Sequence, residues 1–488
     1  MKNTLLIIFS CINSFVFAQS GITWGMMGMD IANNTHDNMQ PRIAVDGSGN
    51  PLIIWGRMSD ESVFFSRWNG TAFTAPVKLN PAWLTVATAS WMGPDIAAKG
   101  DTVYVVVRQT PESTDTSKHI YIMRSFDGGV SFSTPILVDN IGDSISRFPA
   151  VTIDDNGNPI VAFMKFNPTF GDSRWVVTKS SDFGNTFSPD VKASDYNGAG
   201  DEVCDCCPGT IISSGNVCAM LYRDNASNIR DMWTGISTNG GASFPSGFAV
   251  DTNDWMIMSC PSSGPDGIII GDTLYSVYMS GGSGSYRVYF SKTIISTGEL
   301  ISHTALTGAI TGLTQQNYPR IARNGNAVAI VWKQNVSGAT QLPMLFTNNI
   351  SNGFPATYDT VDLANETNTD VAVSNGNVYV VWQDDNSNTV KYRTGTFTPD
   401  TVAIISSVKE IAENTFSIYP NPTNDFLNIK SISSENFSVN IFNALGEKIY
   451  SAVSTLNLKL VTQNFSNGIY FLQIKSERKS FTQKFIKQ

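Results

Sequence analysis

The sequence has little of what several common protein classes require. Charged residues make up 15% of its 488 residues, against roughly 25% in an average soluble domain. Asp plus Glu (41) outnumber Lys plus Arg (32), and the net charge of −9 provides no basic face for nucleic acid. After the first twenty residues, no apolar run approaches the ~18 residues of a membrane-spanning helix. Because the sequence contains three histidines, we predict neither a histidine metal centre nor a bound cofactor.

In place of charge, the chain is rich in Gly, Asn, Ser and Thr, and 11% of it is aromatic. This composition is typical of many short strands joined by tight turns. A hydrophobic content of 42% is enough to build a core, so the composition argues against global disorder. Since one core rarely organises so long a chain, we predict an all-β protein with more than one folded unit.

The N-terminus has the pattern of a secretory signal peptide. Lys2 precedes an apolar stretch over residues 5–17, and Ala18 closes a small-residue cleavage site. We therefore predict that residues 1–18 are removed and that the chain leaves the cytoplasm. Two alternatives stay open. One is a buried N-terminal strand, and the other is a lipoprotein signal at Cys11, which the bulky residue before it disfavours.

The C-terminus differs in charge from the rest of the chain. Residues 415–488 hold eight basic and four acidic residues, a net +4, which leaves −13 for residues 1–414. Three alternating apolar segments, beginning at Phe416, Ile441 and Phe465, are separated by Asn-Pro, Leu-Gly and Asn-Gly turns, which predicts a small β-sandwich after a linker over residues 399–414. These segments closely resemble the C-terminal sorting domain of type IX secretion cargo. The resemblance implies recognition by the secretion machinery and delivery to the cell surface or the medium.

Residues 19–398 contain a repeat of 50 to 60 residues. A proline precedes a short apolar strand at spacings of 53, 55, 59, 57 and 54 residues: Pro41, Pro94, Pro149, Pro208, Pro265 and Pro319. Each unit continues with a Gly/Asn turn, a very apolar strand and two further strands, and four antiparallel strands per repeat match one propeller blade. Asp370 opens a shorter seventh unit, and residues 21–31 are available as its outer strand. Seven blades are favoured and six remain open, while a string of β-sandwich modules would need nearer 100 residues per unit.

Three turns between the predicted third and fourth strands share the pattern Ser-x-Asp-x-Gly-x-Ser/Thr-Phe, with Asn in the third copy. The acidic or amide side chain can accept hydrogen bonds from the turn, the glycine supplies a positive φ, and the phenylalanine anchors the turn. The positions are Asp127, Gly129 and Phe132; Asp182, Gly184 and Phe187; and Asn239, Gly241 and Phe244. The pattern resembles the Asp-box (BNR repeat) of sialidases and related propellers, which identifies a fold and not a reaction.

Four cysteines fall at two matching places in successive repeats: Cys204, Cys206, Cys207 and Cys260. In an exported protein they predict two disulfides, with three pairings open. A bridge between blades is within reach, because adjacent innermost strands lie close together. A metal site is disfavoured, since the cluster lacks two spaced Cys-x-x-Cys pairs and a nearby histidine. Cys218 is expected to be a buried apolar residue. Together with the Asp-boxes, these cysteines resemble a group of secreted sialidase-like propellers.

The starts of the innermost strands predict a site at one end of the central channel. Arg42, Arg147 and Arg320, with Tyr318 beside them, are the candidate ligand-binding residues there. The resemblance to sialidases implies an arginine clamp for a carboxylate and a Tyr–Glu nucleophile pair. This chain has Pro41-Arg42-Ile43 in place of their Arg-Ile-Pro, and no Tyr–Glu pair can be assigned. A structural, salt-bridged role for the arginines is the alternative.

The fourth repeat holds a second group of polar residues. Asp201 and Glu202 are weak candidates for a general acid. The ligand-binding candidates of this repeat are Tyr222, Arg223 and Arg230, and a solvated turn with weak ion pairs is the alternative. We therefore predict an exported propeller that recognises glycans or glycoproteins. The alternative is an exo-acting glycoside hydrolase of the sialidase kind.

Overall fold

The computed structural model describes residues 21–32, 37–111, 118–139, 142, 144–198, 202–306, 310–363, 365–400, 416–431, 436–443, 447–454, 457–475 and 480–488. The expected signal peptide and residues 401–415 lie outside these ranges. The chain divides into two compact units, Met1–Asp400 and Thr401–Gln488. Each unit is described by itself.

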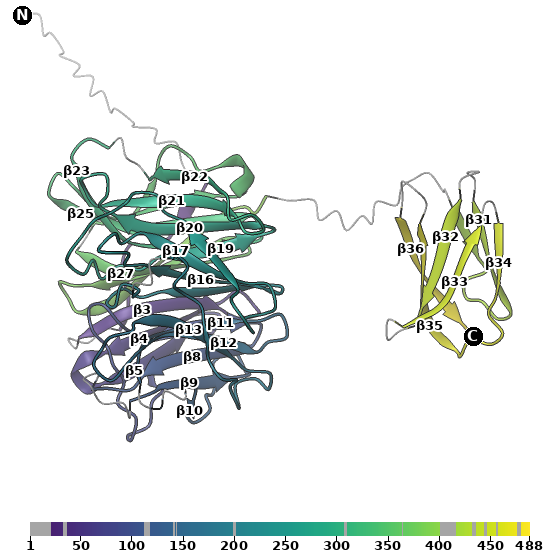
Figure 1. Ribbon diagram of the computed structural model, residues 1–488, viewed down its shortest axis with the longest axis horizontal. Coiled ribbons are helices and arrows are strands. Elements are labelled where there is room, and N and C mark those ends of the chain that lie inside the picture. The colour runs from purple at the N-terminus through teal and green to yellow at the C-terminus, as the bar shows by residue number, and fades with distance from the viewer. Residues whose placement is uncertain are drawn as a thin grey trace, which may run out of the picture. The chain divides into compact units, whose positions relative to one another are not determined.

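The described part of the first unit contains seven antiparallel sheets (Figure 1), and each has one of the predicted repeat starts within its innermost strand or just before it. These innermost strands are β3 (Asn38–Val45), β7 (Asp95–Lys99), β11 (Ile145–Ile153), β15 (Thr210–Ser214), β19 (Asp266–Ile270), β23 (Leu313–Asn324) and β27 (Glu366–Ser374). Each contacts the next in this order, and β27 contacts β3. The ring is therefore closed, and the unit is a seven-bladed β-propeller.

Each blade continues outward through a second, third and fourth strand. The second strands are β4 (Pro51–Arg57), β8 (Thr102–Arg108), β12 (Pro159–Phe166), β16 (Val217–Arg223), β20 (Thr273–Ser280), β24 (Ala327–Val336) and β28 (Asn377–Asp384). The third strands are β5 (Ser62–Arg67), β9 (Ile120–Ser125), β13 (Arg174–Lys179), β17 (Met232–Ser237), β21 (Arg287–Ile294), β25 (Ala339–Thr347) and β29 (Thr389–Thr396). The fourth strands of blades one to six are β6 (Val77–Lys78), β10 (Ile136–Leu137), β14 (Val191–Lys192), β18 (Ser246–Ala249), β22 (Leu300–Ala305) and β26 (Asp359–Asp362).

Blade seven takes its outer strands from the start of the chain. β1 (Thr23–Trp24) and β2 (Met29–Ala32) both pair antiparallel with β29. The prediction that residues 21–31 complete the seventh blade is therefore confirmed, and the described residues leave no irregular terminal unit that would reduce the count to six.

The core lies between neighbouring blades. The second strands are almost entirely buried, and they carry three of the largest fully buried side chains, Trp55, Trp332 and Trp382. One cluster joins Ile43 and Trp55 of blade one to Val381 of blade seven. Because each blade buries its faces only against its neighbours, the blades depend on one another for stability.

A repeated bulge sets which side chains face the channel. In blades one, three, six and seven the innermost strand shifts register at a residue with a left-handed backbone: Gln40 (φ 54°), Phe148 (54°), Tyr318 (53°) and Asn368 (48°). In three of these blades a proline follows, which cannot donate a ladder hydrogen bond. A bulge redirects the side chains beside it, so the residue after this proline takes the same place in blade after blade.

The first Asp-box turn is closed by its own side chains. Asp127 accepts the Ser131 N–H at 3.0 Å and the Ser131 hydroxyl at 2.6 Å. The Ser125 hydroxyl donates to Asp127 at 2.7 Å and accepts the Gly129 N–H at 2.9 Å. These hydrogen bonds from Ser131 and Ser125 lower the pKa of Asp127 to about 2. A Cβ on Gly129 would lie 2.4 Å from Phe65 of the preceding blade, so this turn also packs between blades.

The other two boxes repeat this arrangement between the third and fourth strands of blades three and four. Asp182 accepts the Thr186 N–H at 2.9 Å, and Asn239 accepts the Ser243 N–H at 3.0 Å. The anchoring phenylalanines Phe132, Phe187 and Phe244 pack against three different core clusters. The boxes are structural turns, as the sequence pattern predicts.

The second unit is a sandwich of two antiparallel sheets (Figure 1). One sheet has the order β30 (Phe416–Tyr419), β31 (Phe426–Ser431), β34 (Asn457–Val461), and the other has the order β33 (Lys448–Ser454), β32 (Phe437–Phe442), β35 (Gly468–Lys475), β36 (Ser480–Lys487). Both sheets contribute residues to one hydrophobic cluster, in which Leu427, Val439 and Leu472 are fully buried. The predicted β-sandwich is therefore present.

Helical structure is scarce in both units. Within the described ranges, the helical segments are two 3-10 turns, η1 (Met58–Asp60) and η2 (Ile350–Asn352). Neither is long or apolar enough to cross a membrane, and the described residues contain no other helix that could.

Candidate functional site

The seven equivalent positions that follow the repeat starts converge on one cavity of about 200 Å³. These positions are Arg42, Asp95, Ala150, Gly209, Asp266, Arg320 and Asp370, one from each blade in order. A smaller hollow of about 30 Å³ shares Gln40, Arg42 and Arg320 with it. Because all seven blades contribute, the cavity lies on the propeller axis. Its lining is charged in blades one, two, five, six and seven and small in blades three and four.

The three channel aspartates link one blade to the next. Asp95 accepts the Val151 N–H at 2.9 Å. Asp266 accepts the Ile321 N–H at 3.0 Å. In each pair the aspartate starts one innermost strand and the amide belongs to the innermost strand of the following blade.

The third aspartate makes the same link where the ring closes. Asp370 of blade seven accepts the Ile43 N–H of blade one at 3.0 Å. Each of the three carboxylates therefore has one oxygen held by the next blade, and each also borders the cavity.

Burial alters the protonation of the channel carboxylates. It raises the pKa of Asp266 to about 6, an increase that Arg320 partly offsets. Burial likewise raises the pKa of Asp95, against the opposing charge of Arg42. The channel is therefore a poorly hydrated place in which charges are held by their neighbours.

The pKa values of the two channel arginines, Arg42 and Arg320, are shifted in opposite directions. Burial and the charge of Arg320 lower the pKa of Arg42 to about 10. For Arg320, burial disfavours the charge, but Asp266 and Asp370 outweigh that effect and raise its pKa.

Neither arginine is locked in a tight ion pair among the described residues. Arg42 donates to the Pro41 carbonyl at 2.9 Å and to the Gln40 side chain at 3.5 Å. The closest carboxylate to Arg320 is Asp266, with 4.0 Å between nitrogen and oxygen. Both arginines line the cavity, and each guanidinium group has more N–H donors than these contacts use.

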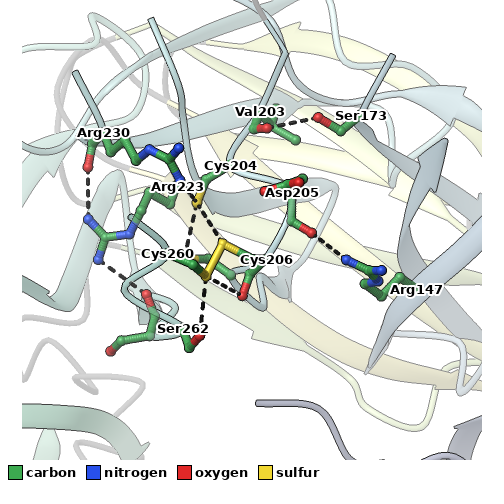
Figure 2. The surroundings of a disulfide bond; sticks show 12 residues. Arg147, Ser173, Val203, Cys204, Asp205, Cys206, Arg223, Arg230, Cys260 and Ser262 are labelled. Atoms are coloured by element: carbon green, nitrogen blue, oxygen red, sulfur yellow. Dashed lines mark hydrogen bonds between the residues drawn. A yellow bond between two sulfur atoms is a disulfide. The ribbon is translucent and has the colours of Figure 1, made fainter. Parts of the chain in front are cut away.

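Arg147, the third predicted arginine, lies elsewhere. Its Nη1 donates to the Asp205 carbonyl at 2.8 Å (Figure 2), and its guanidinium stacks 5.3 Å from the Trp91 ring centre. It is not among the residues that line the cavity. The reason is its place in the repeat: Arg147 stands two residues before Pro149, whereas Arg42 and Arg320 each follow their proline directly.

The other predicted site residues are dispersed. Tyr318 borders the smaller hollow. Tyr222 and Arg223 have no exposed surface, so they support the interior of blade four and meet no ligand from outside. Glu202 is exposed, accepts the Asp172 N–H and does not line the cavity. Asp201 lies outside the described residues.

A cluster of cysteine sulfur atoms (Figure 2) lies at the rim of the channel, next in the chain to residues that line the two hollows. Cys206 and Cys260 form a disulfide with Cα atoms 6.1 Å apart and a sequence separation of 54 residues. This is the bridge between successive blades that the sequence predicts. Two cavity-lining residues, Pro208 and Gly209, follow the cluster directly, so the bridge holds the chain that shapes this side of the cavity.

The second predicted disulfide is not formed, which corrects the expectation of two. Cys204 and Cys207 are free and buried, and their sulfur atoms lie 3.3 Å apart, in hydrogen-bond contact. Arg230 donates from Nη1 to the Cys204 sulfur at 3.2 Å. Cys204 is therefore a free cysteine whose sulfur is hydrogen-bonded to Cys207 and Arg230, and it is not half of a disulfide. Arg230 is engaged inside the cluster, which removes it from the channel cavity.

The three free cysteines among the described residues differ in acidity. The hydrogen bond with Cys207 lowers the pKa of Cys204, and the positive charges of Arg223 and Arg230 add to this effect. Burial raises the pKa of Cys207 well above the ordinary value, and the neighbouring Cys204 adds to this. Burial raises the pKa of Cys218 to about 11, in keeping with its predicted role as an apolar core residue.

The sequence pattern contained a signal for the channel aspartates. Asp95, Asp266 and Asp370 occupy the same repeat position as Arg42 and Arg320. The repeat identifies their position but not their role, because a single side chain after a repeated proline does not show that it reaches the next innermost strand. The link becomes visible only when the ring is closed.

Comparison with known families identifies the C-terminal unit. Residues 417–488 match the family model described as a secretion system C-terminal sorting domain. The chain therefore carries the sorting signal of type IX secretion and is exported to the cell surface or the medium. A comparison with curated protein sequences finds no match.

Several solved structures share similarity with the chain. An α-L-arabinofuranosidase from Fusarium graminearum is 13% identical over 67% of this chain and 98% of its own, with a TM-score of 0.45. An α-L-arabinanase from Penicillium chrysogenum is 12% identical over 77% and 99%, with a TM-score of 0.44. A mutant of Trypanosoma rangeli sialidase is 10% identical over 96% and 87%, with a TM-score of 0.44. Similarity at this level assigns none of these activities to the present chain.

Proposed function

We propose that this exported propeller recognises glycans, free or attached to protein, and that it binds a single terminal sugar residue in the channel cavity. The observation that carries the proposal is the convergence of Arg42, Arg320 and three aspartates on one cavity of about 200 Å³. That volume is below the roughly 300–1,000 Å³ typical of pockets for larger ligands. The cavity therefore suits one sugar unit at the end of a chain.

The chemistry of the lining supports a polyhydroxylated ligand. The guanidinium groups of Arg42 and Arg320 donate hydrogen bonds in a planar fork that fits a carboxylate or two adjacent hydroxyls. Each aspartate uses one oxygen on the next blade, and Asp266 and Asp370 use the other oxygen on the N–H of the residue that follows them. Each carboxylate oxygen has a second lone pair that can accept from a ligand hydroxyl. The side chain of Trp91, which borders both hollows, adds an apolar surface. The stacked guanidinium of Arg147 supports that ring.

A binding experiment on the full exported protein tests the proposal. A glycan array, followed by calorimetry on the best ligand, should identify binding that Arg42→Gln and Arg320→Gln each weaken by at least tenfold, equivalent to about 1.4 kcal/mol. Arg67→Gln on strand β5 is the matched control, because it removes the same charge outside the cavity. Absence of any glycan ligand, or equal weakening by the control, would refute the proposal.

The protonation of the channel gives the binding a pH signature. Because the pKa of Asp266 is about 6, its carboxylate becomes neutral as the pH falls from 7 to 5. A sugar that carries a carboxylate should then bind more tightly, since one repelling charge is lost from the lining. A neutral sugar should show little change. Asp266→Asn should remove most of the pH dependence for the acidic sugar.

Hydrolysis by the same cavity is the alternative function. Asp266, with its raised pKa, is the lining residue suited to donate a proton to a glycosidic oxygen. Among the described lining residues there is no glutamate for a Tyr–Glu nucleophile pair, which is why binding is the proposal. Incubation with fluorogenic sialosides and other glycosides should release no fluorophore. Release that Asp266→Asn abolishes would establish the hydrolase instead.

A further inference from the structure

The four cysteines at the channel rim form two layers. The disulfide sulfurs belong to Cys260, which is exposed, and Cys206, which is partly exposed. Beneath them, Cys204 and Cys207 are buried and share Cys-x-x-Cys spacing. The Cys204 sulfur lies 3.3 Å from the Cys207 sulfur and 3.6 Å from the Cys206 sulfur. One thiol thus touches both its partner thiol and an existing disulfide.

The surrounding charges activate this thiol. Arg230, nine-tenths buried, donates to the Cys204 sulfur at 3.2 Å. Arg223 is fully buried, and its guanidinium hydrogen-bonds three backbone carbonyls, those of Arg230, Ser263 and Met279. Two positive charges in a poorly hydrated site favour a negative charge on the nearest sulfur. The thiolate is the form of cysteine that attacks disulfides, while the raised pKa of Cys207 keeps that thiol protonated as a donor.

We propose that these cysteines form a thiol–disulfide relay, in which the solvent-facing Cys206–Cys260 disulfide oxidises the buried Cys204 and Cys207 pair. In the first step, the Cys204 thiolate attacks the Cys206 sulfur, a Cys204–Cys206 bond forms, and Cys260 leaves as a thiolate that takes a proton from water. In the second step, Cys207 gives up its proton to water and attacks the Cys204 sulfur. A Cys204–Cys207 bond forms, and Cys206 leaves as a thiolate.

The relay conserves electrons. One disulfide and two thiols are present before it and after it, so the exchange itself consumes no oxidant. The product has a dithiol at the surface, and a soluble disulfide in the medium can oxidise that dithiol again. The relay thereby offers a route for oxidation to reach a pair of thiols that a dissolved reagent does not contact directly.

A metal site is the competing use of the same sulfurs. Cys204, Cys206 and Cys207 lie close enough to share an ion. However, the Cys206 sulfur is already bonded to Cys260, which leaves two thiols for a metal. The geometry therefore favours exchange between sulfurs over coordination.

The experiment follows disulfide formation in the full-length folded protein. The protein is purified without reductant and incubated with oxidised glutathione. Free thiols are then alkylated, and non-reducing peptide mass mapping locates the disulfides over time. The wild-type protein should acquire the Cys204–Cys207 disulfide while the Cys206–Cys260 disulfide is regenerated. Cys204→Ser should retain Cys206–Cys260 with Cys207 free, and Cys218→Ser should behave as wild type.

Two variants separate the relay from direct oxidation. In a Cys206→Ser/Cys260→Ser double variant, the Cys204–Cys207 disulfide should form at least about tenfold more slowly, because the buried pair must then meet glutathione itself. Arg230→Gln keeps the disulfide intact and should shift the pH dependence of the exchange rate to higher pH. Arg230→Gln therefore tests the relay even if the Cys206→Ser/Cys260→Ser variant does not fold.

Three results would overturn the relay. One is a Cys204–Cys207 disulfide that never forms in the native wild-type protein. Another is a rate that changes neither when the surface disulfide is removed nor with Arg230→Gln. The third is one equivalent of a metal ion bound to the cluster, detected by elemental analysis of the purified wild-type protein and lost in Cys204→Ser.

Discussion

Asp127, in an outer turn of blade two, and Asp266, at the channel start of blade five, both accept backbone hydrogen bonds. The partners of Asp127 lie within four residues of it, and its pKa falls to about 2. Asp266 accepts the N–H of the adjacent Gly267 and also the N–H of Ile321 in the next blade, 55 residues away, and burial raises its pKa to about 6. In the outer turn, the carboxylate of Asp127 is hydrogen-bonded by residues of the same turn. In the channel, a carboxylate in a poorly hydrated place links strands that are far apart in the sequence.

This contrast extends to the other links in the propeller. The channel side holds links between blades, namely the aspartates and the Cys206–Cys260 disulfide. The outer edge holds turns closed by their own side chains. Links between blades restrain long stretches of chain and should matter more to global stability. The channel also presents charged side chains to a cavity that a polar ligand can enter, whereas the side chains of an outer turn are already hydrogen-bonded within the turn.

The largest expected effect is at the disulfide. Cys260→Ser should lower the free energy of unfolding by about 4 kcal/mol, because the bridge closes a loop of 54 residues. Cys218→Ser, a change at a buried thiol without a bridge, is the matched control and should cost much less. Urea denaturation of both variants measures the difference. Equal losses would mean that the link between blades carries no special weight.

The pH dependence of stability should separate the two kinds of aspartate. The pKa of Asp266 rises from 3.8 to about 6 on folding, so the folded state binds the proton more tightly. This tighter proton binding adds about 2–3 kcal/mol to the free energy of unfolding. The added stability is fully present below pH 3.8 and is lost as the pH rises through 6. Asp127 does the opposite, since its lowered pKa gives stability above pH 3.8 that is lost as the pH falls through 2.

Unfolding curves measured from pH 2 to 7 check this. The difference in unfolding free energy between wild type and Asp266→Asn reports the change between pH 3.8 and 6. The difference between wild type and Asp127→Asn reports the change between pH 2 and 3.8. A wild-type advantage over Asp266→Asn that grows between pH 4 and 7 would contradict the assignment of Asp266.

The next largest loss of stability is expected from removing the hydrogen bond between Asp370 and Ile43, which links blade seven to blade one. Asp370→Ala leaves the buried Ile43 N–H without its acceptor and should cost about 2 kcal/mol. Asp101→Ala, at an exposed turn, is the control and should change stability by less than about 0.5 kcal/mol. Thermal unfolding of the two variants provides the measurement. If both variants melt together, the hydrogen bond from blade seven to blade one is not a stabilising link.

The smallest effect is expected in the outer turn. Asp127→Ala removes hydrogen bonds that solvent can largely replace, so the loss should be about 1 kcal/mol. Asp127→Asn should recover part of it, because Asn239 fills the same place in blade four with an equivalent N–H bond. Ligand affinity should not change in either variant. Weakened ligand binding with unchanged stability would show that the Asp-box belongs to the ligand site, which would contradict the distinction between outer turns and channel.

Much of the fold follows from repeated sequence. The prolines from Pro41 to Pro319 mark the innermost strands, the Asp-box pattern marks outer turns, and both are confirmed in position. These features are predictable because each depends on residues close together in the chain. The link between blades at Cys206 and Cys260 is predictable for a related reason, since both cysteines stand at the same place in successive repeats.

The candidate site is predictable only in part. Arg42 and Arg320 line the cavity, but Arg147 does not, because it lies before the bulge at Phe148 and its side chain stacks on an aromatic surface. The prediction of a second disulfide was wrong, because Cys204 and Cys207 are free. Cys204 contacts the guanidinium of Arg230, which lies 26 residues away in the sequence, and nothing in the sequence indicates that contact.

Blade seven is assembled from both ends of the propeller chain. Thr23 pairs with Thr396, 373 residues later. Synthesis begins at the N-terminus, so β1 and β2 emerge first and have no partner until β29 has followed. Pairing across so long a separation slows folding. A chain of this design cannot close its ring of blades until nearly all of the propeller has been made.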